Sequence, residues 1–309
     1  MGTSTIRELT RLFSRVHQLP RLETIDLIFY EWWSDPDGEV RLPLQESILG
    51  ALVTSFSIRA SPTLISLSLH NLYPSALSSL DSPPFQTVLK TLRHLQLFMT
   101  LNGTWRTNQS IDHWCNFWGT LCPRIFLGPT QHTLTELTLH SNTYVGASSG
   151  LSLRELHFPH LCALSLRNLV FDRSVGAEYF VLRHTSTLAR LELLFCKLPI
   201  DRRQQQPPIL IPGSSTILPG DNESGSGLDC WYGIWDRFAV ELTALVGLHV
   251  EERRRIPSIR LECPYVKAGP SVSYCETDVP ELRKVTDAEA LRRFQTTVAA
   301  RSEEMRRKS

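Results

Sequence analysis

The sequence predicts an α/β fold in which short parallel strands alternate with covering helices, stacked into a horseshoe-like solenoid. The first observation is a recurring pattern, Leu-x-x-Leu-x-Leu, which is the strand signature of a leucine-rich repeat. Its five clear copies begin at Leu64, Leu92, Leu134, Leu161 and Leu188. Three of the four intervals between these copies are 27 or 28 residues long, within the range of such repeats. In addition, the segments between the copies carry apolar residues at helical spacing.

The leucine pattern also predicts which way the side chains of each strand point. Leucine alternates with polar residues at the end of each copy, which is the periodicity of a β-strand. The leucines therefore share one face of the predicted sheet, and that apolar face needs a cover of helices. Two weaker copies extend the series, Leu22-Glu-Thr-Ile25-Asp-Leu27 and Leu245-Val-Gly-Leu248-His-Val250.

The covering helices are predicted in the segments between the copies, at residues 47–56, 83–89, 112–118, 175–182 and 229–242. Two prolines open the second helix, where they suit a first helical turn. Asp112 is predicted to be the N-cap of the third. In the fifth, Trp231, Trp235 and Phe238 form one stripe. Such a stripe is more typical of a face packed against a core than of a ligand platform.

The pattern divides the chain into leucine-rich repeats at 1–198, an insertion at 199–228, the last helix–strand repeat with an irregular segment at 229–286, and a C-terminal capping helix and tail at 287–309. The insertion is rich in Pro, Gly, Ser and Gln, which predicts a loop or a disordered segment. Asp287 is predicted to N-cap the last helix, and Leu291, Phe294 and Val298 form its apolar stripe. A solenoid needs such a helix because its last repeat otherwise exposes the core.

Composition argues against several classes of partner. The formal net charge is +1, from 32 Lys and Arg against 31 Asp and Glu, whereas nucleic-acid-binding proteins usually show a basic balance. No apolar run approaches the length of a membrane span or of a signal peptide. The seven cysteines form no Cys-x-x-Cys pair, which favours buried thiols in the cytoplasm or nucleus. We therefore expect neither a nucleic acid nor a membrane as the partner.

One motif suggests catalysis. Gly146-Ala-Ser148-Ser-Gly150 matches the Gly-x-Ser-x-Gly pattern of a nucleophile elbow, so a serine hydrolase that uses Ser148 is one alternative. That elbow needs a strand directly before it and a helix directly after it. Ser141-Asn142-Thr143 intervenes after the predicted strand. A flexible turn is therefore the favoured interpretation, and we expect the protein not to be an enzyme.

Histidines raise the question of a metal site. His70, His94, His140 and His249 fall on or beside predicted strands, and neighbouring strands lie roughly 5 Å apart. His70 and His140 are two strands apart, however, and no carboxylate or cysteine clearly completes a set of ligands. We therefore expect a scattered polar lining, with no metal and no cofactor.

The predicted binding surface is the sheet face that points away from the covering helices. Its residues alternate with the leucines and are polar and varied. They are Ser68, His70, His94, Gln96, Phe98, Glu136, Thr138, His140, Ser165, Arg167, Arg190 and Glu192. Phe98, Arg167 and Arg190 are the strongest single candidates, because aromatic residues and arginine dominate binding hot spots. The expected occupant is a protein that the sequence does not identify.

Longer runs of the chain resemble a known family. Residues 20–33, 117–171, 178–198 and 230–252 are similar to the leucine-rich repeat region of fungal F-box-type proteins. In that family, an N-terminal F-box recruits the adaptor subunit of a cullin ubiquitin ligase, and the repeats hold the substrate. The resemblance implies a non-enzymatic scaffold that acts as the substrate-binding part of such a ligase.

The F-box itself is an open alternative. Leu19-Pro20 followed by Ile28-Phe29 resembles the opening of an F-box, which would place a degenerate box near residues 17–45. Such a box would recruit the cullin-ligase adaptor subunit. The same segment contains Leu22-x-x-Ile25-x-Leu27, which reads as a repeat strand and leaves no room for a separate three-helix unit. Protein binding by the repeats is the leading hypothesis, and adaptor recruitment is the alternative.

Overall fold

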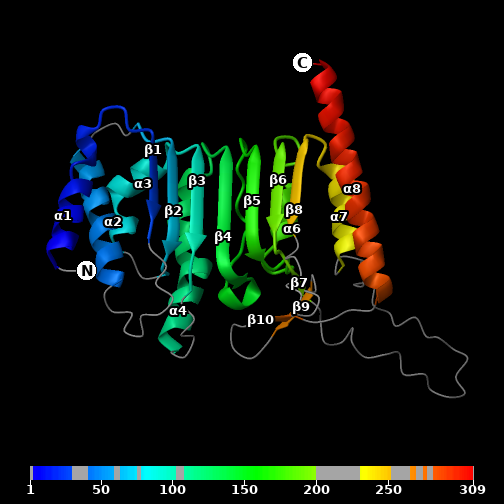
Figure 1. Cartoon of the computed structure of the whole chain (residues 1–309), viewed down its shortest axis with the longest axis horizontal. Coiled ribbons are helices and arrows are strands. Elements are labelled where there is room, and N and C mark those ends of the chain that lie inside the picture. The colour runs from blue at the N-terminus through cyan, green and yellow to red at the C-terminus, as the bar shows by residue number, and fades with distance from the viewer. Residues whose placement is uncertain are drawn as a thin grey trace, which may run out of the picture.

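The computed structural model contains a sheet of seven parallel strands, which confirms the predicted α/β class (Figure 1). The described residues are 3–29, 41–58, 63–74, 78–101, 108–199, 230–251, 265–268, 274–276 and 281–308. The strands are β1 (Thr24–Ile28), β2 (Ser66–Leu72), β3 (His94–Met99), β4 (Glu136–Val145), β5 (Ala163–Leu169), β6 (Arg190–Leu194) and β8 (Gly247–Glu251). They lie in the sheet in chain order, so each strand pairs with the next one along the chain.

Helices cover one face of this sheet and lie at its two ends (Figure 1). They are α1 (Thr3–Phe13), α2 (Arg41–Ile58), α3 (Pro83–Leu89), α4 (Asn108–Asn116), the π-helix η3 (Phe117–Leu127), α5 (Gly128–Thr130), α6 (Ala177–Leu182), α7 (Trp231–Glu241) and α8 (Glu281–Lys308), with short 3-10 turns η1 (Val16–Gln18), η2 (Ser78–Asp81) and η4 (Ala147–Ser149). Their apolar side chains and the strand leucines form one hydrophobic cluster. Helices α1 and α2 lie at one end of the sheet, and α7 and α8 lie side by side at the other (Figure 1).

The strand register places the pattern leucines opposite one another. Leu95 of β3 pairs with Leu67 and Leu137, and Leu97 pairs with Leu69 and Leu139. All of these side chains are almost fully buried. The register therefore confirms that the leucines share the face under the helices, since a slip of one residue would turn them all to solvent.

Asparagine side chains near the strand ends form hydrogen bonds with the backbone of the preceding strand unit. The Asn71 side-chain amide donates to the Phe29 carbonyl at 2.8 Å, and the Asn168 amide donates to the Ser141 carbonyl at 2.7 Å. Asn142 both accepts from the backbone N–H of Leu101 and donates to its carbonyl. Both Asn71 and Asn168 have a φ of 56°, a left-handed conformation that asparagine tolerates better than most residues. Each bond reaches from one strand unit back to the preceding one.

The structure contains helices in all five predicted segments, and most of them begin at a different residue from the predicted one. Helix α3 matches residues 83–89, whereas α2 is longer than the predicted 47–56. Helix α6 starts only after Gly176, whose φ of 70° breaks the helical conformation. The N-cap prediction for Asp112 is wrong, because α4 begins at Asn108 and runs directly into η3. The tryptophan stripe of α7 is buried, which confirms it as a packed face.

The prediction that Asp287 caps its own helix is also wrong. Helix α8 begins at Glu281, so Asp287 lies inside it and points at the neighbouring helix α7. Its Oδ1 accepts the backbone N–H of Tyr232 at 2.8 Å, and its Oδ2 accepts the Tyr265 hydroxyl. The first turn of a helix has free N–H donors that a carboxylate satisfies. Asp287 therefore caps α7, while Phe294 and Val298 of α8 are buried as predicted.

A second, smaller sheet occupies part of the predicted irregular segment. It contains β7 (Leu198–Pro199), β9 (Tyr265–Ala268) and β10 (Tyr274–Glu276) in the order β10-β9-β7. The predicted insertion at 199–228 lies outside the described residues, apart from Pro199. Among the helices that the structure describes, none has both the length and the apolar character needed to cross a membrane.

Candidate functional site

The sheet face away from the helices carries three rows of side chains, one residue from each strand in every row. The first row is Thr24, Ser66, His94, Glu136, Ala163, Arg190 and Gly247. The second row is Asp26, Ser68, Gln96, Thr138, Ser165, Glu192 and His249. The third row is Ile28, His70, Phe98, His140, Arg167, Leu194 and Glu251. All of the predicted face residues belong to these rows.

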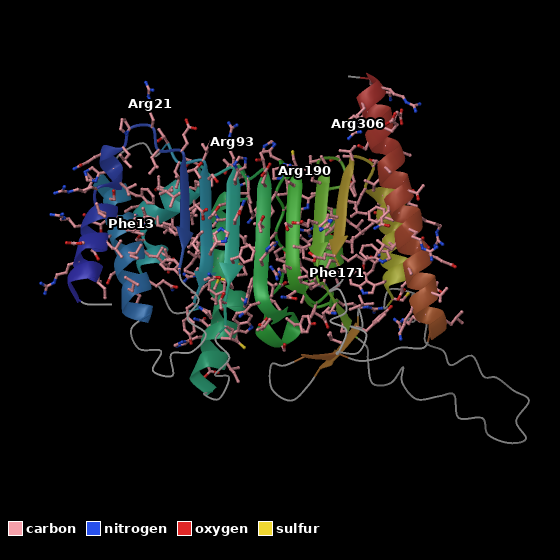
Figure 2. The ribbon with its side chains drawn as sticks, viewed as in Figure 1. Phe13, Arg21, Arg93, Phe171, Arg190 and Arg306 are labelled. Carbon is pink, nitrogen blue, oxygen red and sulfur yellow. The ribbon has the colours of Figure 1, made fainter. Side chains whose placement is uncertain are left out.

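The rows run across the sheet, at right angles to the strands. Arg93 and Arg190 lie at the end of the sheet where the strands begin (Figure 2). Most face residues are half-buried, because neighbours about 5 Å away on adjacent strands cover their flanks. The structure therefore places in one row residues that lie far apart in the sequence, such as Ser68 and Glu192.

Aromatic contacts organise the middle of the third row. The Phe98 ring lies between two histidines, with its centroid 5.0 Å from that of His70 and 4.4 Å from that of His140. The Nε2 atom of His70 lies 3.3 Å from Oδ1 of Asp26 on β1. Further along the row, the Arg167 guanidinium lies over the ring of Phe195, 5.1 Å from its centroid. Phe98 and Arg167 are thus both held in place by aromatic neighbours.

A hydrogen-bonded chain joins the third row to the second. Ser165 donates its hydroxyl hydrogen to Oε2 of Glu192, and its Oγ lies 2.7 Å from Nε2 of His140. Because the serine has one hydrogen to donate, we assign the proton of His140 to Nε2. Burial, followed by the charges of Arg167 and His70, lowers the pKa of His140 to about 3. The histidine is therefore neutral, and its buried Nδ1 has no hydrogen-bond partner among the residues that the structure describes.

An ion pair bridges three strands in the first row. Arg190 on β6 reaches over Ala163 on β5, and its Nη2 lies 2.6 Å from Oε1 of Glu136 on β4. The alanine methyl group is small enough to lie beneath this bridge. The stem of Arg190 lies close to Gly247, where an added Cβ would approach Cγ of Arg190 to 3.2 Å. The Arg190 side chain is 65% exposed and that of Glu136 is 41% exposed, so the pair contributes little to stability.

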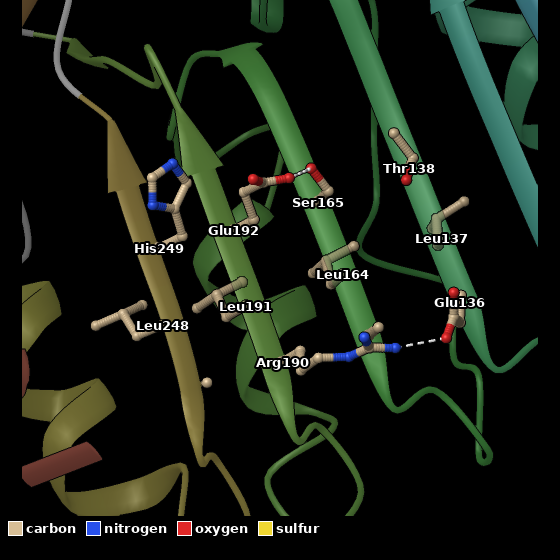
Figure 3. Close-up of a pocket in the computed structure, with 12 residues that line it drawn as sticks. Glu136, Leu137, Thr138, Leu164, Ser165, Arg190, Leu191, Glu192, Leu248 and His249 are labelled. Atoms are coloured by element: carbon tan, nitrogen blue, oxygen red, sulfur yellow. Dashed lines mark hydrogen bonds and ion pairs between the residues drawn. The ribbon is translucent and has the colours of Figure 1, made fainter. Parts of the chain in front are cut away.

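The strands β4, β5, β6 and β8 line an open trough of about 440 Å³, which we name the β4–β8 trough (Figure 3). Its lining is Glu136, Leu137, Thr138, Ala163, Leu164, Ser165, Arg190, Leu191, Glu192, Gly247, Leu248 and His249. The Arg190–Glu136 bridge crosses its first-row side, and Glu192 and Ser165 meet on its second-row side (Figure 3). Its size falls within the range of ligand pockets, roughly 300–1,000 Å³.

Three face residues that line the trough were not among the predicted binding residues: Ala163, Gly247 and His249. Ala163 and Gly247 leave space by their small size, and His249 forms the end of the second row. The signal for His249 is the weaker leucine pattern that begins at Leu245, because its register places residue 249 beside Glu192. The importance of Ala163 follows only from the distance that the Arg190 side chain spans.

The structure gives little support to a Ser148 nucleophile or to a metal site. Ser148 lies in the short turn η4, which ends at Gly150 with a φ of 75°, and an irregular segment rather than a helix follows it. This context differs from the strand–turn–helix that a nucleophile elbow needs. Within the described part of the chain, no group of His, Cys, Asp or Glu is arranged to hold a metal ion.

Comparison of the chain with protein-family models, curated proteins and solved structures finds no match. The function must therefore be argued from the geometry of the sheet face and from the residue pattern.

Proposed function

We propose that the chain is a non-enzymatic protein-interaction scaffold, and that the three rows of the sheet face hold its protein partner. The observation that carries this proposal is the ordered array of polar and aromatic side chains on the face opposite the helices. Aromatic residues and arginine, which dominate protein interfaces, occur there as Phe98, Arg167 and Arg190. These side chains are also held in defined positions, which lowers the entropic cost of binding.

We further propose that the sheet is a leucine-rich repeat solenoid. The chain-order sheet and the buried leucine register support this, as does the polar residue at the end of successive strands. In the repeat signature, asparagine or cysteine stands three residues after the third leucine. Asn142 and Cys196 occupy this position, and each makes hydrogen bonds at a strand end. Residues 188–198 match the full signature, Leu-x-x-Leu-x-Leu-x-x-Cys-x-Leu.

The resemblance to the repeats of fungal F-box-type proteins supports a finer proposal, that the bound protein is a substrate of a cullin ubiquitin ligase in the cytoplasm or nucleus. Direct recruitment of the adaptor subunit by residues 17–45 is less well supported. Within the described part of that segment, β1 pairs with β2 along residues 24–28. This strand is part of the main sheet, whereas an F-box would be a separate helical unit.

Proximity labelling in the native host tests the proposed function. The wild-type chain should label a small set of proteins, and the double variant Phe98→Ala, Arg167→Ala should lose that set while it remains folded. The matched control is Tyr179→Ala, Arg183→Ala, which removes an arginine–aromatic pair on α6 and its C-cap. Labelling that survives the first variant and disappears with the second would place the binding surface on the helices. Co-purification of the adaptor subunit with the chain tests the ligase connection separately.

A further inference from the structure

Among the charges that line the β4–β8 trough, Glu192 has no cationic partner. Glu136 is neutralised by Arg190 at 2.6 Å. The hydrogen bond that Glu192 makes in the described structure comes from the neutral Ser165 hydroxyl and reaches Oε2. Its Oε1 is therefore free to accept, and the carboxylate charge faces the trough uncompensated.

The two neighbouring arginines, Arg167 and Arg190, contact residues other than Glu192. The guanidinium of Arg190 is bound to Glu136 two strands away, and that of Arg167 lies over the Phe195 ring. Neither makes an ion pair with Glu192 in the described residues. A negative charge in a concave and partly desolvated site attracts a cation more strongly than one on an open surface. The trough thus carries one carboxylate whose charge no described side chain neutralises, and a cationic ligand would balance it.

The carboxylate of Glu192 is also oriented in advance. Ser165 donates to it, and His140 in turn lies within hydrogen-bond distance of Ser165. This chain fixes the side chain, so little rotamer entropy remains to be lost on binding. Figure 3 shows the Glu192–Ser165 bond on one side of the trough and the Arg190–Glu136 bridge on the other. The open space of the trough lies between these two interactions.

We propose that the β4–β8 trough binds a basic side chain of the protein partner, with its ammonium or guanidinium group on Glu192. This inference rests on the proposed function, because it names the chemistry of a partner on the same face. A hard metal cation fits less well, since Ca²⁺ requires about 6–8 oxygen ligands and the trough offers one uncompensated carboxylate. The aliphatic stem of a lysine or arginine would lie in the trough beside the Arg190–Glu136 bridge, which itself crosses over Ala163.

A library of short displayed peptides, selected on the full chain, tests this inference. We expect the selected peptides to share one lysine or arginine. Replacing that residue with glutamine or citrulline should weaken binding about tenfold, and Glu192→Gln should weaken it by a similar factor. The two changes combined should cost little more than either alone, because they remove the same interaction. The control is Glu289→Gln, which removes an exposed carboxylate from helix α8, outside the three rows, and should leave binding unchanged.

The outcomes separate this inference from the proposed function. Peptides that lose affinity with Phe98→Ala but keep it with Glu192→Gln would overturn the basic-side-chain inference and leave the binding face intact. The same holds for a shared residue that is not basic, or for losses that simply add in the double change. If no peptide is selected, or if binding is insensitive to every face variant, both the inference and the proposed function are wrong.

Discussion

Leu137 and Thr138 are neighbours in β4 with opposite environments. Leu137 is 1% exposed under the helices, whereas Thr138 belongs to the second row of the open face. This alternation separates the leucines of each strand from the residues between them. The leucines stabilise the sheet by burying apolar area, and the residues between them are available for contact with a partner.

A charge at residue 137 should therefore destabilise the protein far more than a charge at residue 138. Leu137→Asp places an unpaired carboxylate in the hydrophobic cluster, which should cost several kcal/mol of unfolding free energy. Thr138→Asp changes a face residue and should cost less than about 1 kcal/mol. Urea denaturation of both variants measures the difference. Equal losses would show that the register of β4 is wrong.

His140 makes the stability depend on pH. Its pKa is lowered to about 3 in the folded chain, against about 6.5 when unfolded. The unfolded state therefore binds the proton first as the pH falls. The free energy of unfolding is therefore unaffected by protonation of His140 above pH 6.5, and it decreases progressively as the pH falls from 6.5 toward 3.

We expect His140→Gln to reduce this dependence. Between pH 7 and pH 5, the wild-type chain should lose on the order of 1–2 kcal/mol more unfolding free energy than the variant, because glutamine does not titrate. Urea titrations of both chains at the two pH values measure this difference. A gap between the two chains that stays constant with pH would contradict the buried, neutral state of His140.

At the scale of elements, the last helix holds its neighbour through specific contacts. Asp287 of α8 accepts the backbone N–H of Tyr232 in the first turn of α7, and Arg301 donates to the Leu242 and Ala239 carbonyls at the other end of that helix. Helix α8 thus satisfies free backbone groups at both ends of α7. It also covers the apolar stripe of α7 with Phe294.

Removing the buried cap should destabilise α7, whereas removing a surface ion pair between the same helices should not. Asp287→Ala leaves a helix N–H and the Tyr265 hydroxyl without their acceptor, which should cost about 1–3 kcal/mol. Asp236→Ala removes the exposed Asp236–Arg293 pair and should cost less than about 1 kcal/mol. Thermal unfolding and hydrogen exchange in the first turn of α7 measure both effects. Similar losses in the two variants would argue against the cap.

At the scale of the whole molecule, the sheet could be predicted because the Leu-x-x-Leu-x-Leu pattern recurs along the chain. Each leucine pattern marks a strand, and a period-two alternation leaves only one face for the helices. Helix ends could not be predicted as well, since their caps come from distant residues. Asp287 has the right type and position for its own N-cap, yet α7 supplies the N–H group that it binds.

The candidate site shows the same division. The residues of each row could be predicted from the alternation in the sequence, because the strand register places equivalent positions of successive leucine patterns beside one another. The contacts within the rows did not follow, since they depend on side-chain reach and on rotamers. The Arg190 bridge over Ala163 and the His140–Ser165–Glu192 chain each join residues that no spacing rule connects.

Site-specific photo-crosslinking in the native host tests most directly the claim that the sheet face binds a protein. A photoreactive residue at Gln96, in the second row, should form a covalent adduct with a partner protein, and Phe98→Ala should abolish that adduct. The same photoreactive residue at Tyr179, which is 55% exposed on α6, should form none. An adduct at Tyr179 without one at Gln96 would contradict the account, because it would place the partner on the helices.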